Sequence, residues 1–243
     1  MESTKADIVA ALQKQILSLQ GFKTSARNKR LDDLLRPIKN AFPNAVFPLA
    51  AMHEFISSCP EDTAATSGFI SALVSALMQE KGTAVWINAA GKIFPPALQS
   101  FGIAAERIIF INLKKEKQIL WVMEEALKCK RLAAVIAELP ELDFTASRRL
   151  QLAVEQSQVP GFILRCQPKS INTTACVSRW QIKSLSSELA DGMPGLGFPR
   201  WNIDLLKIRN GKPGSWQVEF AAGRFRHINK FPAIEIAQQK QAV

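Results

Sequence analysis

The residues that could do chemistry are few, and their spacing matches no catalytic or metal-binding pattern. The 243 residues include two histidines and four cysteines. The cysteines have no CxxC spacing, which argues against a zinc site or a disulfide framework. The sequence has no GxxxxGK[ST] phosphate-binding loop, no GxSxG nucleophile and no HExxH zinc motif. It therefore predicts a protein that is not an enzyme, with no catalytic residue, metal or cofactor.

The segment after the apolar run 52–56 is poorly suited to phosphate. A phosphate-binding turn needs a lysine to neutralise the phosphates and glycines whose amides point at them. Residues 40–80 contain no Lys or Arg, and residues 57–67 contain no glycine. The segment instead presents Cys59, Pro60, Glu61 and Asp62. Because two carboxylates would repel a phosphate, we expect no ATP hydrolysis and ATP binding weaker than about millimolar.

The net charge of +10 is unevenly distributed along the chain. Residues 1–40 hold eight Lys/Arg against four Asp/Glu, residues 41–164 hold eleven against twelve, and residues 165–243 hold twelve against five. A neutral centre with a basic carboxyl-terminal third favours contact with a polyanion, in particular nucleic acid. The alternative is that the charge serves solubility alone.

The basic residues of the last third are interleaved with Trp180, Trp201, Trp216 and Phe225. Charge combined with stacking surfaces suits single-stranded nucleic acid. The alternative is that the tryptophans belong to the core, since Trp201 and Trp216 fall on the apolar phase of their segments. The residues predicted to bind nucleic acid weakly and without sequence preference are Lys169, Arg179, Lys183, Arg200, Lys207, Arg209, Lys212, Arg224 and Arg226.

Short apolar runs alternate with helical periods through the centre of the chain, which predicts an α/β protein with a mostly parallel sheet covered by helices. The expected parallel strands are 52–56, 84–87, 107–111, 132–137 and 161–164. Apolar residues at helical spacing predict helices at 69–78 and 119–127, and a third after Thr145. His53 lies within the first strand, so we expect a hydrogen-bonded core histidine rather than a ligand or a base.

After Arg165 the apolar period changes to two, which predicts antiparallel strands that extend the sheet. These strands are expected at 176–182, 201–208 and 215–220. Asn210-Gly211 between the last two supplies the positive φ angles that a tight hairpin turn needs. The sequence thus predicts a core at 46–227.

The two ends of the chain are predicted to lie outside this core. Residues 4–20 have the pattern of an amphipathic helix, and the prolines and basic residues of 21–48 predict a linker, so that residues 1–45 form one unit. Residues 228–243 form a tail with an isolated apolar cluster. The apolar residues expected to contact a partner are Ile8, Leu12, Ile16, Leu19, Phe231, Ile234 and Ile236. Intramolecular packing is the alternative for both ends.

Several long blocks of the sequence resemble the ImuA family, in the family's order. They are HEFISSCPEDTAATSGFI (53–70), VWINAAGKIFPPALQSFGI (85–103), LKKEKQILWVMEEALKC (113–129), FTASRRLQLAVEQS (144–157) and GFPRWNIDLLKIRNGKPGSWQVEF (197–220). The resemblance covers about residues 46–226. It implies a RecA-like core, with the cell-division inhibitor SulA as a more distant relative, and a role beside ImuB in damage-induced translesion DNA synthesis.

The resemblance to a RecA-like fold also implies a nucleotide site that has lost its chemistry. The positions of this degenerate nucleotide site are Ser57, Pro60, Glu61, Asp62, Ser67, Gly68, Ala90 and Glu138. Ala90 stands where RecA has a glutamate that activates water, and it can accept no proton. Glu138 ends the expected strand 132–137 and is predicted to be a solvated carboxylate, since one acid without a phosphate-binding lysine cannot run phosphoryl transfer. The segments that match RecA's two DNA-binding loops, 139–144 and 166–174, are short, which argues against filament-style wrapping of DNA.

The family implies an adaptor whose partners are an ImuB-like Y-family polymerase homologue, RecA, the replicative-type error-prone polymerase and DNA. We expect the carboxyl-terminal part to contact the ImuB-like partner and the amino-terminal helix to contact a RecA-fold protomer. No run of about 18 apolar residues and no signal-peptide pattern occurs, so a cytoplasmic protein without membrane contact is expected. The alternatives are an ATPase with a divergent phosphate-binding loop, and an inhibitor of RecA filaments or of cell division like SulA.

Overall fold

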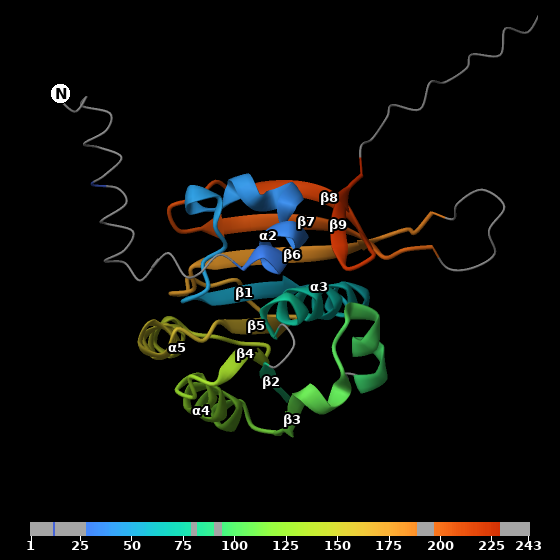
Figure 1. Cartoon of the computed structure of the whole chain (residues 1–243). Helices are drawn as coiled ribbons and strands as arrows, with labels where there is room; N and C mark the ends of the chain where they lie inside the picture. The colour runs from blue at the N-terminus through green and yellow to red at the C-terminus, as the bar shows by residue number, and fades with distance from the viewer. Residues whose placement is uncertain (1–11, 13–27, 79–81, 90–93, 189–196, 229–243) are drawn as a thin grey trace, which may run out of the picture.

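The computed structural model describes residues 12, 28–78, 82–89, 94–188 and 197–228. One nine-stranded sheet runs through these residues, in the order β3-β2-β4-β5-β1-β6-β7-β8-β9 (Figure 1). The strands are β1 (Met52–Ser57), β2 (Thr83–Asn88), β3 (Ile108–Asn112), β4 (Leu132–Glu138), β5 (Gly161–Cys166), β6 (Ser178–Leu185), β7 (Arg200–Ile208), β8 (Gly214–Ala221) and β9 (Arg224–His227). The prediction of a large, mostly parallel sheet with carboxyl-terminal antiparallel strands is confirmed.

Strands β1 to β5 are parallel, and each lies within two residues of its predicted bounds. Strand β6 pairs with β1 in parallel and with β7 antiparallel, so it joins the two halves of the sheet. The prediction that this strand is only antiparallel is therefore wrong on its β1 side. Strands β7, β8 and β9 continue as antiparallel neighbours, and the turn between β7 and β8 has Asn210 at φ 59°, as its Asn-Gly sequence predicts.

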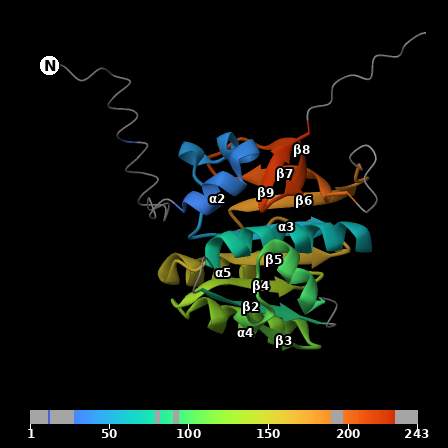
Figure 2. The same ribbon diagram turned by 45° about the vertical axis from the view of Figure 1, so that its right-hand side comes forward.

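Three long helices cover the parallel half, α3 on one face and α4 and α5 on the other (Figures 1 and 2). Their bounds are α3 (Pro60–Met78), α4 (Glu116–Leu127) and α5 (Phe144–Ser157). Buried residues of α3 share one core with Trp86, Phe162 and Trp180. A second core lies beneath α4 and α5. No helix among the described residues is long and apolar enough to cross a membrane.

The prediction of a linker is wrong for residues 28–48. This segment forms α2 (Lys29–Leu34) and the 3-10 helices η1 (Arg36–Ala41) and η2 (Pro43–Ala45), which pack on the sheet near α3 and β9. Leu34, Ile38 and Phe42 are buried in the same core as α3. The helices are too short for a recognisable apolar period, and two of the prolines that predicted a linker, Pro37 and Pro43, lie in the first turns of η1 and η2 instead.

Strand β9 was also missed by the sequence. It follows a tight turn with Ala222 and Gly223 both at positive φ, and it pairs with β8. Its four residues carry one core side chain, Phe225, which stacks on Phe69 of α3 at a centroid distance of 5.2 Å. A strand this short gives no alternating pattern, so only its tertiary contacts define it. The remaining 3-10 helices are η3 (Pro95–Phe101) and η4 (Ala105–Arg107).

Candidate functional site

The turn from β1 to α3 is too short to wrap a phosphate. Strand β1 ends at Ser57 and α3 begins at Pro60, which leaves two residues between them. A phosphate-binding loop wraps its ligand with about eight residues. The hydroxyl of Ser57 lies 3.0 Å from that of Thr66, and both side chains are buried. The hydroxyls of Ser57 and Thr66 are thus bonded to each other inside the fold.

The carboxylates at the start of α3 face outward or bind protein. Glu61 is exposed, and hydrogen bonds from its own backbone amide and from the Cys59 thiol lower the pKa of its carboxyl. Asp62 accepts a hydrogen bond from the Ser184 amide at 3.2 Å, which ties α3 to β6. The Asp62 amide lowers the pKa of the Cys59 thiol, but Glu61, partial desolvation and the Asp62 carboxylate together raise it above its usual value. Cys59 therefore lacks the low pKa of a nucleophilic thiol at a helix amino terminus.

A cleft of about 760 Å³ opens at the carboxyl ends of the parallel strands, between α3, η3 and the adjoining ends of β6 and β7. It brings together five positions of the predicted degenerate nucleotide site, which come from α3 and β4: Pro60, Glu61, Ser67, Gly68 and Glu138. Ser57 lies beneath it and Asp62 beside it, while Ala90 lies outside the described residues. The wall of the cleft is mostly apolar and aromatic, with Trp86, Leu98, Phe101 and Trp201.

The prediction that Glu138 is a solvated carboxylate is wrong. The residue is 7% exposed, and its carboxylate accepts a hydrogen bond of 2.8 Å from the Trp86 indole.

Gly68 is explained by packing rather than by a role in binding nucleotide. A Cβ at this position would lie 3.0 Å from the Phe101 ring and 3.1 Å from the Trp201 ring, so the glycine lets both rings approach α3. Gly68 thus makes room for Phe101 and Trp201 in the aromatic wall of the cleft, while the hydrogen bond to Glu138 holds Trp86 there.

The charges around the cleft are unfavourable to phosphate. Arg200 is the one basic residue among the described residues that line it. Its guanidinium lies 2.7 Å from a Glu188 oxygen and 2.9 Å from a Glu219 oxygen, and these carboxylates raise its pKa. The exposed carboxylate of Glu61 adds negative charge at the mouth. The cleft is therefore apolar and acidic where a nucleotide site is polar and basic.

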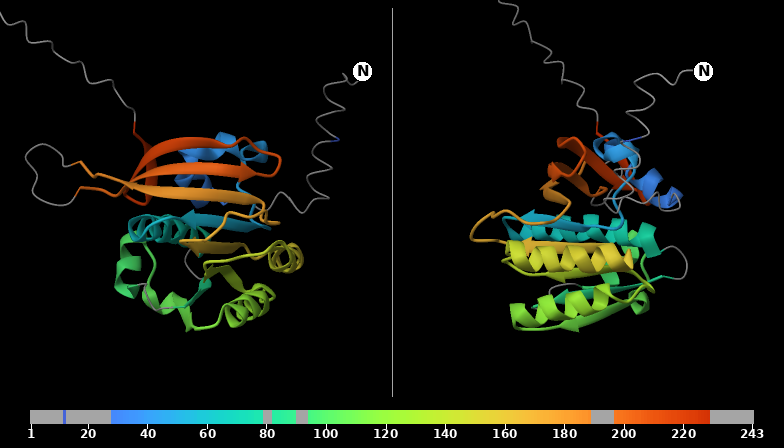
Figure 3. Two further views of the ribbon diagram at one scale, coloured as in Figure 1. Left: turned by 180° about the vertical axis from the view of Figure 1, so that it is seen from behind. Right: turned by 90° about the vertical axis from the view of Figure 1, so that its left-hand side faces the viewer.

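The antiparallel strands β6 to β9 have one face that no described helix covers (Figure 3, left). Their inner face packs against α2, α3 and η1 through residues such as Ile182, Ile203 and Val218. Cross-strand pairing places Lys183 beside Asn202, Arg179 beside Lys207, and Glu219 beside Arg226 on the opposite face. This surface, together with the β7–β8 and β8–β9 turns, is termed the open face.

The nine predicted nucleic-acid contacts fall into three groups. Arg179 and Arg200 are bonded to carboxylates and are largely enclosed. Arg209 is half-buried and donates to the Ala175 carbonyl at 3.5 Å. The exposed cations, which have no ion pair with a described carboxylate, are Lys169, Lys183, Lys207, Lys212, Arg224 and Arg226. Lys207 also donates to the Thr174 carbonyl at 3.1 Å.

The tryptophans do not provide a stacking surface for bases. Trp180 and Trp201 are buried in the core, and Trp216 is partly buried against it. Trp201 and Trp216 fall on the apolar phase of their segments, and this pattern correctly favoured the alternative that the tryptophans belong to the core. Phe198, beside the cleft, and Leu206 are the large apolar side chains of the antiparallel segment that are exposed among the described residues. The open face is thus charged and polar, without aromatic platforms.

A buried ion network joins the two halves of the sheet, and sequence reasoning missed it. Glu54 of β1 is fully buried and receives hydrogen bonds from Arg165 of β5 at 2.9 Å and from Arg179 of β6 at 2.7 Å. The hydroxyl of Thr174 donates to the same carboxylate at 2.9 Å. Opposite charges within two apolar strands, at 54 and 165, were the signal that could have found it.

The same arginines fix the two segments that were predicted to match RecA's DNA-binding loops. Arg165 donates to the Pro140 carbonyl at 3.2 Å and to Glu141 at 3.1 Å, both between β4 and α5. It also donates to the Ser170 carbonyl at 2.8 Å, and Arg179 reaches the Asn172 carbonyl at 2.6 Å, both between β5 and β6. These short connections are held against the sheet by charge-assisted hydrogen bonds.

His53 is a core histidine, as predicted. Its Nδ1 lies 2.7 Å from the Ser178 hydroxyl and its Nε2 2.8 Å from the Pro48 carbonyl. Because the Trp180 indole donates to the Ser178 oxygen at 2.6 Å, the Ser178 proton is directed to Nδ1, and Nε2 carries the proton that reaches Pro48. Burial of the neutral ring lowers the pKa of His53 to about 4.

The predicted partner contacts at the two ends of the chain lie almost wholly outside the described residues. This holds for Ile8, Ile16, Leu19, Phe231, Ile234 and Ile236. Leu12 is helical and 51% exposed. The contacts proposed for these residues therefore stay predictions.

Together, the fold and the cleft define a class of α/β protein: a parallel sheet with an antiparallel extension, whose strand-end cleft lacks a phosphate cradle among the described residues. Protein ImuA of Caulobacter vibrioides, from strains NA1000 and CB 15, is 35% identical over 194 residues, which cover 75% of this chain and 80% of that protein. The chain belongs to the ImuA family.

Two further similarities are weaker. The cell division inhibitor SulA of Photorhabdus laumondii is 28% identical over 103 residues, or 42% of this chain and 58% of that protein. The crystal structure of SulA from Pseudomonas aeruginosa has 22% identity and a TM-score of 0.41, covering 48% of this chain and 98% of that one. No family model matches the sequence.

Proposed function

We propose that this protein is a non-catalytic, RecA-like adaptor in damage-induced translesion DNA synthesis. It links an ImuB-like polymerase homologue to DNA, and it works beside RecA and the replicative-type error-prone polymerase. Membership of the ImuA family supports the process. The observation that carries the non-catalytic part is the two-residue turn between β1 and α3, beside a cleft whose one basic lining residue among those described is already paired with carboxylates.

The DNA contact is proposed for the open face. Lys183, Lys207, Arg224 and Arg226 place four exposed cations on one uncovered surface and its turn, with Lys212 in the adjacent β7–β8 turn. Phosphate contacts by such residues are independent of sequence and weaken with salt. Because no aromatic platform accompanies them, binding should be weak and should depend on charge rather than stacking.

The contacts with protein partners are proposed for both ends of the chain. The apolar cluster at 231–236 would bind the ImuB-like partner, and the amphipathic helix predicted for residues 4–20 would bind a RecA-fold protomer. Deletion of residues 228–243 should then abolish capture of the ImuB-like protein, and deletion of 1–22 should abolish capture of RecA. Capture that survives both deletions in folded protein would reject this arrangement.

The adaptor function is tested by binding without nucleotide. The full chain is titrated into the ImuB-like protein of the same organism and, separately, into a fluorescent single-stranded oligonucleotide, with and without ATP and Mg²⁺. We expect both to bind, with affinities that ATP does not change. A requirement for ATP, or turnover of ATP that Glu138→Ala abolishes, would contradict the proposal and favour an ATPase with a divergent phosphate-binding loop.

A SulA-like inhibitor is the second candidate function, and it is supported only by the partial similarity to SulA. Such a protein would need no DNA contact of its own. Reversal of the exposed cations on the open face would leave an inhibitor of RecA filaments or of cell division intact, whereas it would disable the adaptor.

A further inference from the structure

The cleft at the strand ends retains the position of a nucleotide site but has different chemistry. Trp86, Leu98, Phe101 and Trp201 give it an apolar lining. A ligand site of this size usually buries apolar groups and uses a few polar ones for orientation. An occupant of this cleft must therefore bring apolar surface with it.

The charged groups of the cleft select the sign of the occupant. Glu61 at the mouth is an exposed carboxylate, and the exposed Glu188 contacts Arg200, which lines the cleft. The charge of Arg200 is balanced by Glu188 and Glu219. A cation is attracted both by these carboxylates and by the faces of aromatic rings, whereas phosphate is repelled. The occupant is therefore basic as well as apolar.

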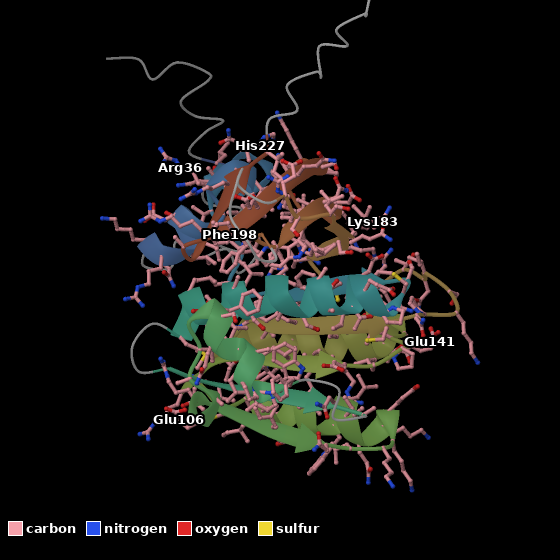
Figure 4. All side chains as sticks on the ribbon, turned by 90° about the vertical axis from the view of Figure 1, so that its right-hand side faces the viewer. Arg36, Glu106, Glu141, Lys183, Phe198 and His227 are labelled. Atoms are coloured by element: carbon pink, nitrogen blue, oxygen red, sulfur yellow. The ribbon has the colours of Figure 1, made fainter. Side chains whose placement is uncertain are left out.

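The apolar surface continues beyond the cleft, which favours a polypeptide over a small molecule. Phe94 lines the cleft and is 68% exposed, and Phe198 lies between the lining residues Gly197 and Pro199 and is 54% exposed. Figure 4 shows Phe198 above α3, on the same side of the molecule as Lys183. Exposed aromatic residues at the rim of an apolar groove are typical of a protein-binding surface.

We propose that the cleft is a docking site for a segment of a protein partner in which a lysine or arginine neighbours a large apolar side chain. The apolar side chain would pack against Phe101 and Trp201, and the cation would approach Glu61. The inference rests on the proposed adaptor function, because it takes the partner to be the ImuB-like protein. This contact would be additional to the one proposed for the carboxyl-terminal tail.

The first test fills the cleft and reverses its charge. Ala64 lines the cleft at an exposed position of α3, so Ala64→Trp adds bulk at the mouth, and Glu61→Lys removes the attraction for a cation. The matched controls are Leu152→Trp on the exposed side of α5 and Glu116→Lys in the first turn of α4, which is also an exposed acidic position at a helix start. Affinity for the ImuB-like protein is measured by biolayer interferometry with the full chain, and melting temperatures check folding.

We expect the double variant Ala64→Trp/Glu61→Lys to bind the ImuB-like protein at least about tenfold more weakly, while the control pair binds within about twofold of the unsubstituted protein. Unchanged affinity of the cleft variant, while the unsubstituted protein binds, would overturn the docking site and leave the adaptor function standing. Failure of the unsubstituted protein to bind at all would instead overturn the adaptor function, and the docking site with it.

The second test locates the contact directly by thiol footprinting. Cys166 lines the cleft and is partly exposed, whereas Cys129 is exposed near the end of α4. The ImuB-like protein should slow alkylation of Cys166 by N-ethylmaleimide about fivefold or more and leave Cys129 unchanged. Equal alkylation of Cys166 in the free and bound protein would overturn the proposal. Protection of Cys166 by ATP and Mg²⁺ would also overturn it, since it would restore a nucleotide site.

Discussion

The two halves of the sheet differ in how their faces are used. The parallel half, β1 to β5, is covered on both faces by α3, α4 and α5, and the segment 41–164 that contains most of it has one more acidic than basic residue. The antiparallel half, β6 to β9, is covered by the described helices on one face only and lies within the segment 165–243, which has seven more basic than acidic residues. The covered half is a scaffold with a cleft at its strand ends, and the uncovered half offers a surface for a charged partner.

The boundary between the halves is the parallel pair of β1 and β6, and it is polar on both faces. On one face Glu54, Arg165 and Arg179 form the buried ion network. On the other, His53 and Ser178 form the hydrogen-bonded chain to Trp180. If this boundary supports the fold and the two halves have separate roles, changes at the boundary and in each half should have different effects.

The largest effect is expected from breaking the boundary at Arg165. Arg165→Leu removes one donor from each of Glu54, Glu141 and two backbone carbonyls and breaks the fully buried ion pair with Glu54, so we expect the free energy of unfolding to fall by about 3–5 kcal/mol. Urea unfolding measures the change. The matched control, Arg149→Leu, removes an exposed ion pair with Glu124 and should cost less than about 1 kcal/mol. Equal losses in the two variants would show that the network does not hold the halves together.

A smaller, pH-dependent effect is expected from His53. Its folded pKa of about 4 lies below the unfolded value of 6.5, so the unfolded chain takes up a proton first as the pH falls. His53 therefore removes stability as the pH falls through this window. The loss should be about 2 kcal/mol between about pH 7 and about pH 5, and about 3 kcal/mol in full.

Comparison with His53→Asn isolates this contribution. The variant should be less stable at neutral pH but should lose less stability on acidification than the unsubstituted protein. His227→Gln, at an exposed histidine of β9, is measured beside it as the variant that removes the other histidine. If His53→Asn and the unsubstituted protein had parallel stability curves between about pH 7 and about pH 5, the buried neutral histidine would be refuted.

The role of the uncovered half is tested by charge reversal on the open face. The triple variant Lys183→Glu, Lys207→Glu, Arg226→Glu should bind a single-stranded oligonucleotide about tenfold or more weakly at low salt. Its slope of log affinity against log salt should fall by about 0.7 for each lost phosphate contact. Fluorescence anisotropy measures both.

The control applies the same charge change to the covered half. Lys114, Lys117 and Lys130 are exposed at the two ends of α4, and their reversal to Glu should lower DNA affinity much less. Both triple variants should keep their stability to within about 1 kcal/mol. Equal losses of affinity would mean that overall charge, and not the open face, attracts the DNA.

The smallest effect is expected for nucleotide. With no phosphate cradle at the β1–α3 turn, ATP and Mg²⁺ at about millimolar concentration should shift the melting temperature by less than about 1 °C. Glu138→Gln should not alter this result, because its carboxylate bonds to Trp86. A clear rise of the melting temperature with ATP would show that the cleft binds nucleotide. The parallel half would then be more than a scaffold.

The regular elements were predictable because their patterns are local. The strands β1 to β5 are short apolar runs, and the hairpin from β7 to β8 has an alternating pattern around Asn210-Gly211. Residues 28–48 and β9 were missed because tertiary packing, rather than any local period, buries Leu34 and Phe225. The bounds of the short helices in residues 28–48 and of β9 depend on tertiary contacts, which the sequence does not show.

The sequence predicted that the candidate site lacks a phosphate-binding loop, but it did not predict the aromatic cleft that the structure has in its place. The missing lysine and glycines around Glu61 were visible in the sequence, but the aromatic lining from Phe101 and Trp201 was not, since these residues lie far apart along the chain. Likewise, the nine candidate contacts to nucleic acid could be selected from the sequence only by their charge. Only the fold shows that Arg179 and Arg200 are bonded to carboxylates, while Lys183 is exposed.

The central claim is that one molecule of this protein joins a polymerase-like partner to DNA without nucleotide chemistry. Analytical ultracentrifugation of the full chain, the ImuB-like protein and a labelled single-stranded oligonucleotide, without ATP, tests this most directly. We expect a species that contains all three components, and the label should leave it when the open-face triple variant is used while the two proteins remain together. Competition between the oligonucleotide and the ImuB-like protein for the chain, with no ternary species at any ratio, would contradict the account.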